Sequence, residues 1–518
     1  MTEIIRTYED LEALIKKTYV TPDLTLVKKA YEVASRAHEG EVRFTGHPYM
    51  VHPLAVAYKL AEMGFNMNMV VAGLLHDVIE DSEKFSLEDL AHKFGEDVAG
   101  MVDGVTKLKK IRYQGVERYV ENMRRMFIAM ASDVRVIFIK FADRQHNLQT
   151  LYARPKHKQE RVARETLEIY APIANRLGMG EMKGEMEDLS FKYLYPKEYD
   201  WVQQIMDTKV REKGVQITRV IDDVEQYLKT SDIKIIQVHG RVKRLYSLYR
   251  KLQHRDNDIT KIHDLVAVRI VVSDVEDCYA VLGLVHQKWH PMPNRIKDFI
   301  AQPKPNGYQS LHTTVFVPGG ETVEFQIRTE EMHELAEYGV AAHWRYKETG
   351  RSQPKNLRWM EEMVAIQKEL ADKKDFMEQL EVLKIDVFRD RIFVLTPQGD
   401  VIDLPEGATP VDFAFYVHTN VGNKCTAARV NEVLVNLDTP LNSGDVVEII
   451  TDKNRRGPNP DWLKFVKTHH ARERIREAAR FGMKSWFAHM MPKSSNKEKP
   501  KKKEKNKMEK TVKSENKK

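Results

Sequence analysis

The sequence has few of the features that mark secreted or membrane proteins. It contains only two cysteines, Cys278 and Cys425, in 518 residues, too few for a disulfide framework or a cysteine zinc site. It has no run of 18 or more uncharged apolar residues, which excludes a transmembrane helix. The N-terminal stretch MTEIIRTYEDLEALIKK lacks the apolar segment of a secretory signal. We therefore expect a cytoplasmic protein without membrane contact.

Basic charge is in excess only in one short segment. The formal net charge is +7, but residues 493–518 alone hold 12 Lys and 4 Glu, which leaves 71 basic and 72 acidic residues elsewhere. Anion-binding sites in the body must therefore be local clusters. The tail, residues 491–518, is poor in apolar residues and is predicted to be disordered. It either binds RNA phosphates nonspecifically or only keeps the chain soluble.

The hydropathy pattern changes along the chain and predicts several domains. Residues 1–195 repeat apolar side chains at helical spacing, as in LVKKAYEVASRAH, which predicts an all-α domain. In residues 196–345, short β-rich runs such as LVAVRIVVSD alternate with helical stretches, which predicts a mixed α/β domain. Residues 346–384 are predicted to be a helical connector, 385–451 a small β-rich domain, and 452–490 the start of a helical region. The expected fold class is multidomain, α and α+β.

Two imidazoles and two carboxylates of the first domain form a candidate metal set. They are His52 in YMVHP, His76 and Asp77 in LLHDVIED, and Asp143 in KFADRQHN. A mixed N/O set suits a divalent ion of intermediate hardness, such as Mn²⁺ or Fe²⁺. Water bound to such an ion attacks phosphorus near neutral pH. An HD dipeptide also arises by chance, so these residues alone leave a metal site and a meaningless coincidence both open.

Further acidic residues lie at helical spacing from this set. On a continuous helix His76 shares a face with Glu80, and Asp77 shares a face with Asp81. Asp143 and Asn147 are related in the same way. We expect Glu80 and Asp81 to orient a water molecule or to transfer protons.

The second domain holds a candidate polyphosphate site. The segment GRVKRLYSLYRKL carries five basic residues within eleven positions: Arg241, Lys243, Arg244, Arg250 and Lys251. Asp264 and Glu324 lie in β-like runs, where a carboxylate indicates a bound group such as Mg²⁺ with phosphates. The segment RIKDFIAQPKPNGYQSLHTT adds further candidates: Arg295, Lys297, Lys304, Asn306, Tyr308 and His312. No Walker-type P-loop is present. A solvated basic face remains the alternative interpretation.

The first domain resembles the hydrolase domain of the RelA/SpoT family of guanosine tetraphosphate (ppGpp) enzymes. The matching stretches are RFTGHPYMVHP, GLLHDVIED, VDGVTKL, ADRQHN and RETLEIYAPIANRLG. The resemblance implies an HD-type domain that removes pyrophosphate from the 3′ position of ppGpp. It assigns the Mn²⁺ ligands (His52, His76, Asp77, Asp143), the catalytic pair (Glu80, Asp81) and nucleotide contacts (Arg43, Asn147, Thr150). The sequence departs from several relatives at Phe44, where they carry a basic residue beside the guanine.

The second domain is similar, nearly without gaps, to the synthetase domain of the same family. The similarity runs from GRVK to EFQIRTEEMHELAEYGVAAHWRYK. It implies a nucleotidyltransferase-like fold that transfers pyrophosphate from ATP to the 3′-oxygen of GDP or GTP. By position, Asp264 and Glu324 serve Mg²⁺ and activate the 3′-hydroxyl, and Tyr308 stacks on guanine. The remaining nucleotide contacts are implied to be Arg241 and Arg269 at the adenine, with Lys243, Lys251, Arg295, Lys297, Lys304, Asn306 and His312. Residues 295–298 match the RxKD form of bifunctional members.

Residues 385–451 resemble a TGS domain, a small β-grasp module that contacts the CCA end of tRNA in this family. His418 matches a His of that motif, whereas Asn423 stands where relatives usually carry a second His. Deacylated tRNA is the partner that this resemblance implies. The zinc-finger and ACT-type domains of long members have no counterpart here, so strong stimulation by the ribosome is not expected.

Three functions are compatible with these features. The first, which we favour, is a bifunctional enzyme that makes ppGpp from ATP and GDP or GTP and also hydrolyses it. The second is a ppGpp hydrolase whose synthetase-like domain only senses nucleotides. The third is a catalytically idle regulator that associates with tRNA or the ribosome.

Overall fold

A computed structural model describes residues 5–81, 84–109, 125–126, 128–130, 132–229, 231, 233–262, 265–304, 306–318, 320–342, 391–455 and 457–490. The chain splits into two compact units, Met1–Phe393 and Val394–Lys518. The predicted connector at 346–384 and the tail at 491–518 lie outside the described residues. The two units are considered separately below.

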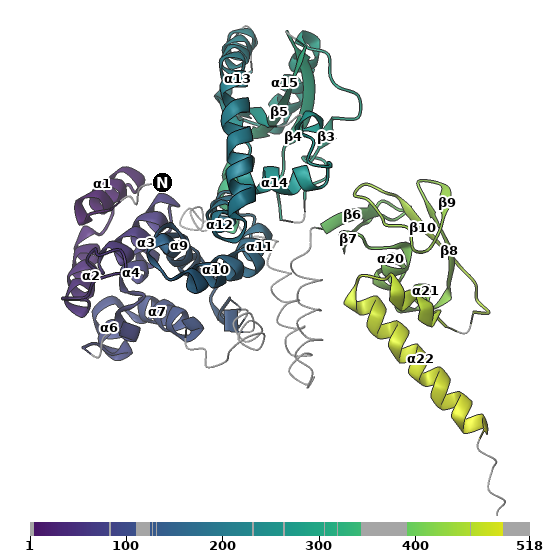
Figure 1. Cartoon of the computed structure of the whole chain (residues 1–518), viewed down its shortest axis with the longest axis horizontal. Helices are drawn as coiled ribbons and strands as arrows, with labels where there is room; N and C mark the ends of the chain where they lie inside the picture. Colours follow the sequence, from purple (N-terminus) through teal and green to yellow (C-terminus); the bar gives the residue numbers. More distant parts are fainter. Residues whose placement is uncertain are drawn as a thin grey trace, which may run out of the picture. The chain divides into compact units, whose positions relative to one another are not determined.

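The N-terminal part of the first unit is built from helices, apart from one isolated bridge between Val42 and Pro48. In chain order the described elements are α1 (Tyr8–Thr18), α2 (Leu24–Ala37), α3 (Val51–Glu62), α4 (Met67–Leu75), α5 (Val78–Asp81), α6 (Leu87–Phe94), α7 (Glu96–Lys109), α9 (Arg135–Gln149), the 3-10 turn η1 (Leu151–Ala153), α10 (Lys156–Glu165), the π-helical turn η2 (Thr166–Tyr170), α11 (Ala171–Arg176) and α12 (Gly180–Leu194). Figure 1 shows them in purple to blue. The expected all-α fold of this region is confirmed.

Helix α9 lies at the centre of this helical bundle. It is buried along most of its length, including Ile137, Phe138, Ile139 and Phe141. Helix α2 is amphipathic instead: Asp23 caps its N-terminus by accepting a hydrogen bond from the Leu26 amide (3.1 Å), and one apolar face enters the same core. A buried central helix is surrounded by protein on all sides, so any polar side chain that it carries must find a partner inside the bundle.

The mixed part of the first unit begins with the long helix α13 (Pro196–Leu228). Its further elements are β1 (Ile235–Val242), α14 (Leu245–Gln253), η3 (Ile259–Lys261), β2 (Val266–Val272), α15 (Val275–Lys288), β3 (Lys297–Asp298), β4 (Leu311–Val317), β5 (Glu321–Thr329) and α16 (Glu330–Tyr338). The five strands form one sheet in the order β1-β2-β5-β4-β3. Strands β2 and β5 pair in parallel and the other neighbours pair antiparallel. The predicted mixed α/β fold is confirmed.

The two faces of this sheet differ in chemistry. Val268 and Phe325 belong to one apolar core with Val224 of α13 and Val281 of α15, so these helices cover one face. Alternate side chains point to the opposite face. The strand register places polar side chains there: His239, Arg241, Arg269, His312, Glu324, Gln326 and Arg328. We call this surface the polar face of the sheet.

The second unit contains a small β-rich fold and a helix. Its elements are β6 (Arg391–Leu395), β7 (Val401–Pro405), α20 (Pro410–Val417), α21 (Thr419–Lys424), β8 (Cys425–Val430), β9 (Val433–Val435), β10 (Val447–Thr451), η5 (Pro460–Lys464) and α22 (His469–Met490). Strands β10, β8 and β9 form one sheet, and β6 pairs with β7. Trp462 and Ile475 pack in one core with Phe415, so η5 and α22 share the core of the β-rich fold.

A buried carboxylate also joins the β-rich fold to the segment before α22. Asp412 of α20 is fully buried, and its Oδ1 accepts hydrogen bonds from the amides of Lys467 (2.9 Å) and Thr468 (2.7 Å). Its Oδ2 accepts from the amide and the hydroxyl of Thr409, both at 2.9 Å. Asp412 thereby caps its own helix and fixes the segment that leads into α22.

We predict that Asp412→Ala destabilises the second unit by about 3 kcal/mol, because several buried donors lose a charged acceptor. Hydrogen exchange of the full chain measures this as lost amide protection in residues 394–490. Asp438→Ala, at an exposed position, is the matched control. Equal protection in the two variants would contradict the prediction.

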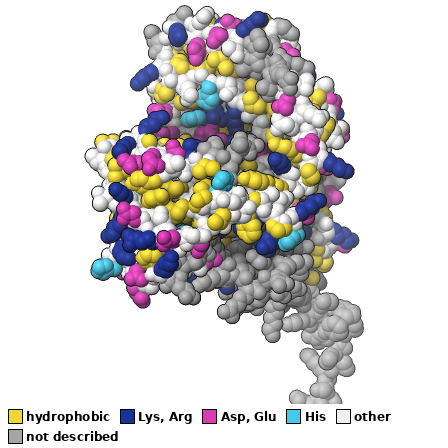
Figure 2. Space-filling model, turned by 60° about the vertical axis from the view of Figure 1, so that its left-hand side comes forward, with side chains coloured by type: hydrophobic (Ala, Val, Ile, Leu, Met, Phe, Trp, Pro, Cys, Tyr) yellow, Lys and Arg dark blue, Asp and Glu magenta, His cyan; other side chains and the backbone are white. Residues whose placement is uncertain are grey.

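The surface carries charges of both signs. On the face shown in Figure 2, Lys and Arg side chains are interspersed with Asp and Glu, as expected for a body with almost balanced charge. Within the ranges given above, no helix is long and apolar enough to cross a membrane.

Candidate active sites

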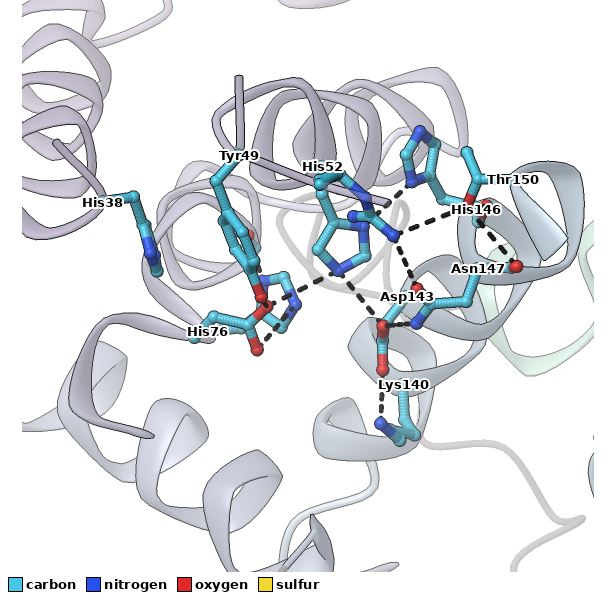
Figure 3. A network of polar contacts seen from close by, with 12 residues as sticks. His38, Tyr49, His52, His76, Lys140, Asp143, His146, Asn147 and Thr150 are labelled. Carbon is cyan, nitrogen blue, oxygen red and sulfur yellow. Dashed lines mark hydrogen bonds and ion pairs between the residues drawn. The ribbon is translucent and has the colours of Figure 1, made fainter. Parts of the chain in front are cut away.

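Three helical segments bring the predicted metal ligands together. His52 stands in the first turn of α3, His76 and Asp77 follow α4, and Asp143 lies in the middle of α9. All four side chains are buried. Ligand atoms of His52, His76 and Asp143 lie within 4.8 Å of one another. Figure 3 shows these side chains converging on one point between the helices.

The assumption of a continuous helix through His76 and Asp77 is wrong. Helix α4 ends at Leu75 and α5 begins at Val78, so the two ligands occupy the turn between them. Adjacent side chains on a regular helix diverge by about 100°, which would aim one of the two away from the site. In this turn both side chains reach the site: Asp77 Oδ1 lies 3.3 Å from His76 Nε2, and Asp77 Oδ2 lies 3.5 Å from His52 Nε2. The assumption does hold in α9, where the Asn147 amide donates to Asp143 Oδ1.

Hydrogen bonds prepare the imidazoles for a metal. His76 Nδ1 lies 2.8 Å from the Gly73 carbonyl oxygen, which can only accept, so Nδ1 carries the proton. His76 Nε2 is buried without a hydrogen-bond partner in the described part of the chain, and it lies 3.3 Å from Asp77 Oδ1. His52 Nδ1 contacts His146 Nδ1 at 2.9 Å, and its Nε2 lies 3.2 Å from Asp143 Oδ1. Burial lowers the pKa of His52 to about 4, which keeps its ring neutral.

The carboxylates are held by residues that the sequence had not indicated. The Tyr49 hydroxyl donates to Asp77 Oδ2 at 2.9 Å, and the Tyr49 ring stacks on buried His38 with centroids 4.4 Å apart. Lys140, one turn before Asp143 on α9, forms an ion pair with it. Partners of this kind orient ligands around a metal. The mixed donor set, the buried His76 Nε2 beside the Asp77 carboxylate and the neutral His52 ring together fit a divalent cation.

The predicted nucleotide contacts lie beside this centre. Arg43 Nη2 donates to Asn147 Oδ1 (2.9 Å) and to Thr150 Oγ1 (3.4 Å), so all three residues meet. The exposed ring of Phe44 is covered by the Arg154 guanidinium, 4.1 Å from its centroid. Glu80 is exposed on α5, and the side chain of Asp81 lies outside the described part of the structure.

We predict that Tyr49→Phe weakens Mn²⁺ binding about ten-fold, because Asp77 loses the hydrogen bond that fixes its orientation. The free Mn²⁺ signal in electron paramagnetic resonance measures the dissociation constant directly. Tyr58→Phe on α3 is the control, since the Tyr58 ring itself packs against Arg6 and is retained. An unchanged dissociation constant for Tyr49→Phe would show that Asp77 needs no such partner.

The second constellation forms on the polar face of the sheet. Glu324 Oε1 of β5 lies 2.8 Å from His312 Nδ1 of β4. His312 Nε2 in turn lies 2.8 Å from the Tyr308 hydroxyl. Burial lowers the pKa of His312, which favours its neutral form at neutral pH. The structure thus links three predicted site residues in one network around an acidic group.

A tight turn presents Tyr308 next to this network. The Gly307 amide donates to the Lys304 carbonyl (2.8 Å), and Gly307 has a φ of 76°, which favours glycine. The Asn306 side chain accepts from the Tyr308 amide at 3.2 Å. Lys304 Nζ lies 5.0 Å from the centre of the Tyr308 ring. Lys297 of β3 pairs with His312 in register, which places a further cation at this edge.

The remaining predicted residues of this domain lie on the polar face or next to its strands. Arg241 Nη1 donates to Gln326 Oε1 at 3.4 Å, and Arg269 lies opposite His239 on the neighbouring strand. Lys243 follows β1 and Lys251 lies on α14. Arg295 precedes β3 and lies outside the Glu324–His312–Tyr308 network. Asp264 lies outside the described residues, so its predicted partnership with Glu324 stays a prediction.

In the second unit, the predicted tRNA-contact residue lies at a helix junction. Exposed His418 separates α20 from α21, and its Nδ1 accepts a hydrogen bond from the Asn420 amide at 3.1 Å. Asn423 is half-buried, and its side-chain oxygen has no hydrogen-bond partner within the described ranges.

Three protein families match successive parts of the chain. They are the HD domain at residues 30–180, the region found in RelA / SpoT proteins at 240–351, and the TGS domain at 392–451. The bifunctional (p)ppGpp synthase/hydrolase SpoT of Escherichia coli is 44% identical over 476 residues, which cover 91% of this chain and 67% of the relative. The chain belongs to the RelA/SpoT family.

Other relatives are longer than this RelA/SpoT chain. A GTP pyrophosphokinase of Streptomyces coelicolor is 47% identical, over 90% of this chain and 56% of its own length. One from Myxococcus xanthus is 46% identical, over 89% of this chain and 61% of its own length. The chain thus spans little more than half the length of these relatives. The family expected from the sequence motifs is confirmed.

Proposed function

We propose that this chain is a bifunctional enzyme of ppGpp metabolism. It transfers pyrophosphate from ATP to the 3′-hydroxyl of GDP or GTP, and it hydrolyses ppGpp to GDP and pyrophosphate. The observation that carries the proposal is the presence of two separate polar clusters, each with its own acidic groups, in one chain. The names of the relatives, GTP pyrophosphokinase and (p)ppGpp synthase/hydrolase, support it.

In the hydrolase, His52, His76, Asp77 and Asp143 would hold the divalent ion, and the N/O donor set favours Mn²⁺. When bound, such an ion lowers the pKa of water and polarises a phosphoryl group. The protein supplies the rest. The Arg43 guanidinium is fixed through Nη2 by Asn147 and Thr150, which leaves its other nitrogens for a phosphate of the substrate. The carboxylates of Glu80 and Asp81, just after Asp77, transfer protons.

In the synthetase, Asp264 and Glu324 would hold Mg²⁺, which neutralises charge on the phosphates of ATP. The 3′-oxygen of the acceptor forms a bond to the β-phosphorus of ATP, the bond from this phosphorus to the α,β-bridging oxygen breaks, and AMP leaves. The Glu324 carboxylate accepts the proton of the 3′-hydroxyl. His312 fixes the orientation of that carboxylate. Tyr308 offers its ring to the guanine, and the cations Lys297 and Lys304 offset phosphate charge nearby.

The test uses purified protein with ATP, GDP and Mg²⁺ in the absence of Mn²⁺, with nucleotides resolved by anion exchange. We expect ppGpp and AMP in equal amounts. A second incubation with ppGpp and Mn²⁺ is expected to give GDP and pyrophosphate. Hydrolysis without synthesis would leave a hydrolase with a nucleotide-sensing domain. Neither activity, with preferential binding of deacylated over aminoacylated tRNA through the region of His418, would identify an idle regulator instead.

The proposed substrates are cytoplasmic nucleotides, so the cytoplasm is the proposed location.

A further inference from the structure

Two buried guanidinium groups share one carboxylate on the polar face. Arg269 of β2 is 5% exposed and Arg328 of β5 is fully buried. Arg269 Nη1 and Arg328 Nη2 both donate to Glu337 Oε1 of α16, at 2.8 and 2.9 Å. Arg328 Nη2 also lies 2.7 Å from His333 Nδ1. We call these four residues the arginine cluster.

Local structure explains how the cluster forms. Helix α16 begins directly after β5, with the Thr329 side chain capping it by accepting from the Met332 amide at 3.2 Å. His333 and Glu337 are four residues apart and share one helix face. Arg328, the second-to-last residue of β5, reaches that face across the junction. The end of β5 and helix α16 are thereby joined to Arg269 on the neighbouring strand β2.

The cluster carries a surplus of positive charge. Burial and the neighbouring Arg328 charge lower the pKa of His333 to about 4, so it is neutral at neutral pH and two cations face one anion. Nε and Nη2 of Arg269, and Nε and Nη1 of Arg328, have no hydrogen-bond partner among the described residues. Burial and the Arg328 charge lower the pKa of Arg269 to about 10. An arrangement with unused donors and excess charge is stabilised when an anion approaches it.

The cluster lies on the same sheet face as the network of the proposed transfer reaction. Arg269 is paired in register with Gln326. Gln326 accepts from Arg241 at 3.4 Å and donates through Nε2 to Glu324 Oε1 at 3.2 Å. Gln326 therefore lies between Arg269 and two other residues of the polar face, Glu324 and Arg241. On its other side, Arg269 donates to Glu337, which also accepts from Arg328.

We propose that Glu337 and Arg328 are positioning residues for the transfer reaction: they hold Arg269, which the family resemblance assigns to the adenine of ATP. The inference rests on the proposed synthetase function. Glu337 belongs to α16 and was not among the predicted site residues, although it lies in the stretch that carries the family similarity. It acts through Arg269 rather than on the nucleotide. If Glu337 only stabilised the fold, its loss would change KM for ATP and KM for GDP by the same factor. It would also lower the melting temperature.

The test compares Glu337→Gln with wild type in steady-state transfer, varying ATP and GDP separately. The amide removes the charge that orients Arg269, so KM for ATP is expected to rise about ten-fold or more, with KM for GDP within about two-fold. Glu331→Gln, exposed on the same helix, is the matched control and keeps wild-type constants. Should Glu337→Gln not yield folded protein, Glu337→Asp, with one methylene fewer, replaces it, and the same split between the two KM values is expected.

A double-variant cycle completes the test. Because Glu337 acts through Arg269, Arg269→Ala with Glu337→Gln is expected to have the same KM for ATP as Arg269→Ala alone. Additive effects, equal changes for both substrates, or an unchanged KM for ATP would overturn the inference. Wild-type protein without any transfer would instead overturn the proposed synthetase itself. Hydrolysis of ppGpp with Mn²⁺ by each variant reports that the rest of the unit is folded.

Discussion

Asp143→Asn is expected to reduce ppGpp hydrolysis by about a thousand-fold or more, while transfer from ATP continues. Asp143 is buried at the meeting point of the candidate ligands, 3.2 Å from His52 Nε2. An amide oxygen is a much weaker ligand for a divalent cation than a carboxylate, and it neutralises none of the ion's charge. Initial rates with Mn²⁺, followed by release of pyrophosphate, measure the loss. Mn²⁺ affinity is expected to fall in parallel.

Asp143 also balances a buried cation, and the two roles can be separated. Lys140 is 7% exposed and forms an ion pair with Asp143, so the single variant leaves a buried ammonium group without this partner at a cost of about 3–5 kcal/mol. The double variant Lys140→Met with Asp143→Asn removes that cation as well. We expect it to regain thermal stability and to remain inactive in hydrolysis. Recovery of hydrolysis in the double variant would mean that Asp143 serves only as the counter-ion of Lys140.

Glu324→Gln is expected to have the opposite effect: pyrophosphate transfer falls by about a thousand-fold or more, and hydrolysis stays at the wild-type rate. The amide cannot accept the proton of the 3′-hydroxyl, and it binds Mg²⁺ weakly. It still reaches His312 Nδ1, so the His312–Tyr308 contact is retained and folding is little affected. Formation of AMP from ATP in the presence of GDP measures the transfer.

The control for Glu324→Gln is Glu276→Gln, an exposed position on α15 in the same domain. It removes one negative charge without touching the polar face, and wild-type transfer is expected. Substantial transfer by Glu324→Gln would assign the acceptor of the proton to another group. Asp264 would then be the first candidate, since it is the other carboxylate that the sequence motif indicates.

Several features of both sites could be predicted from residue types alone. Two imidazoles and two carboxylates in an otherwise apolar helical pattern indicated a metal set, and the structure buries all four together. Glu324 stood out because carboxylates are uncommon in β-rich runs. Arg269 in the apolar run LVAVRIVV and Arg328 in EFQIRT carried the same kind of signal. Only the family resemblance drew attention to the first of these two arginines.

Other features depend on contacts that no local pattern encodes. The break between α4 and α5 at His76 and Asp77 is one, because nothing in the run VVAGLLHDVIED interrupts helical periodicity. Tyr49 is another: the sequence analysis did not single it out, and its contact with the site is a hydrogen bond to Asp77, 28 positions later. His146 was quoted within a motif, yet its contact with His52 spans 94 positions.

The sequence by itself determined which elements form, which side chains are candidates for the chemistry and to which family the chain belongs. These properties follow from periodicity, capping and motif spacing, all of which act over a few residues. The tertiary structure decided which of those side chains meet and what holds them in place. Glu337 reaches Arg269 across 68 positions because strand order and helix packing, rather than any local preference, bring α16 onto the polar face of the sheet.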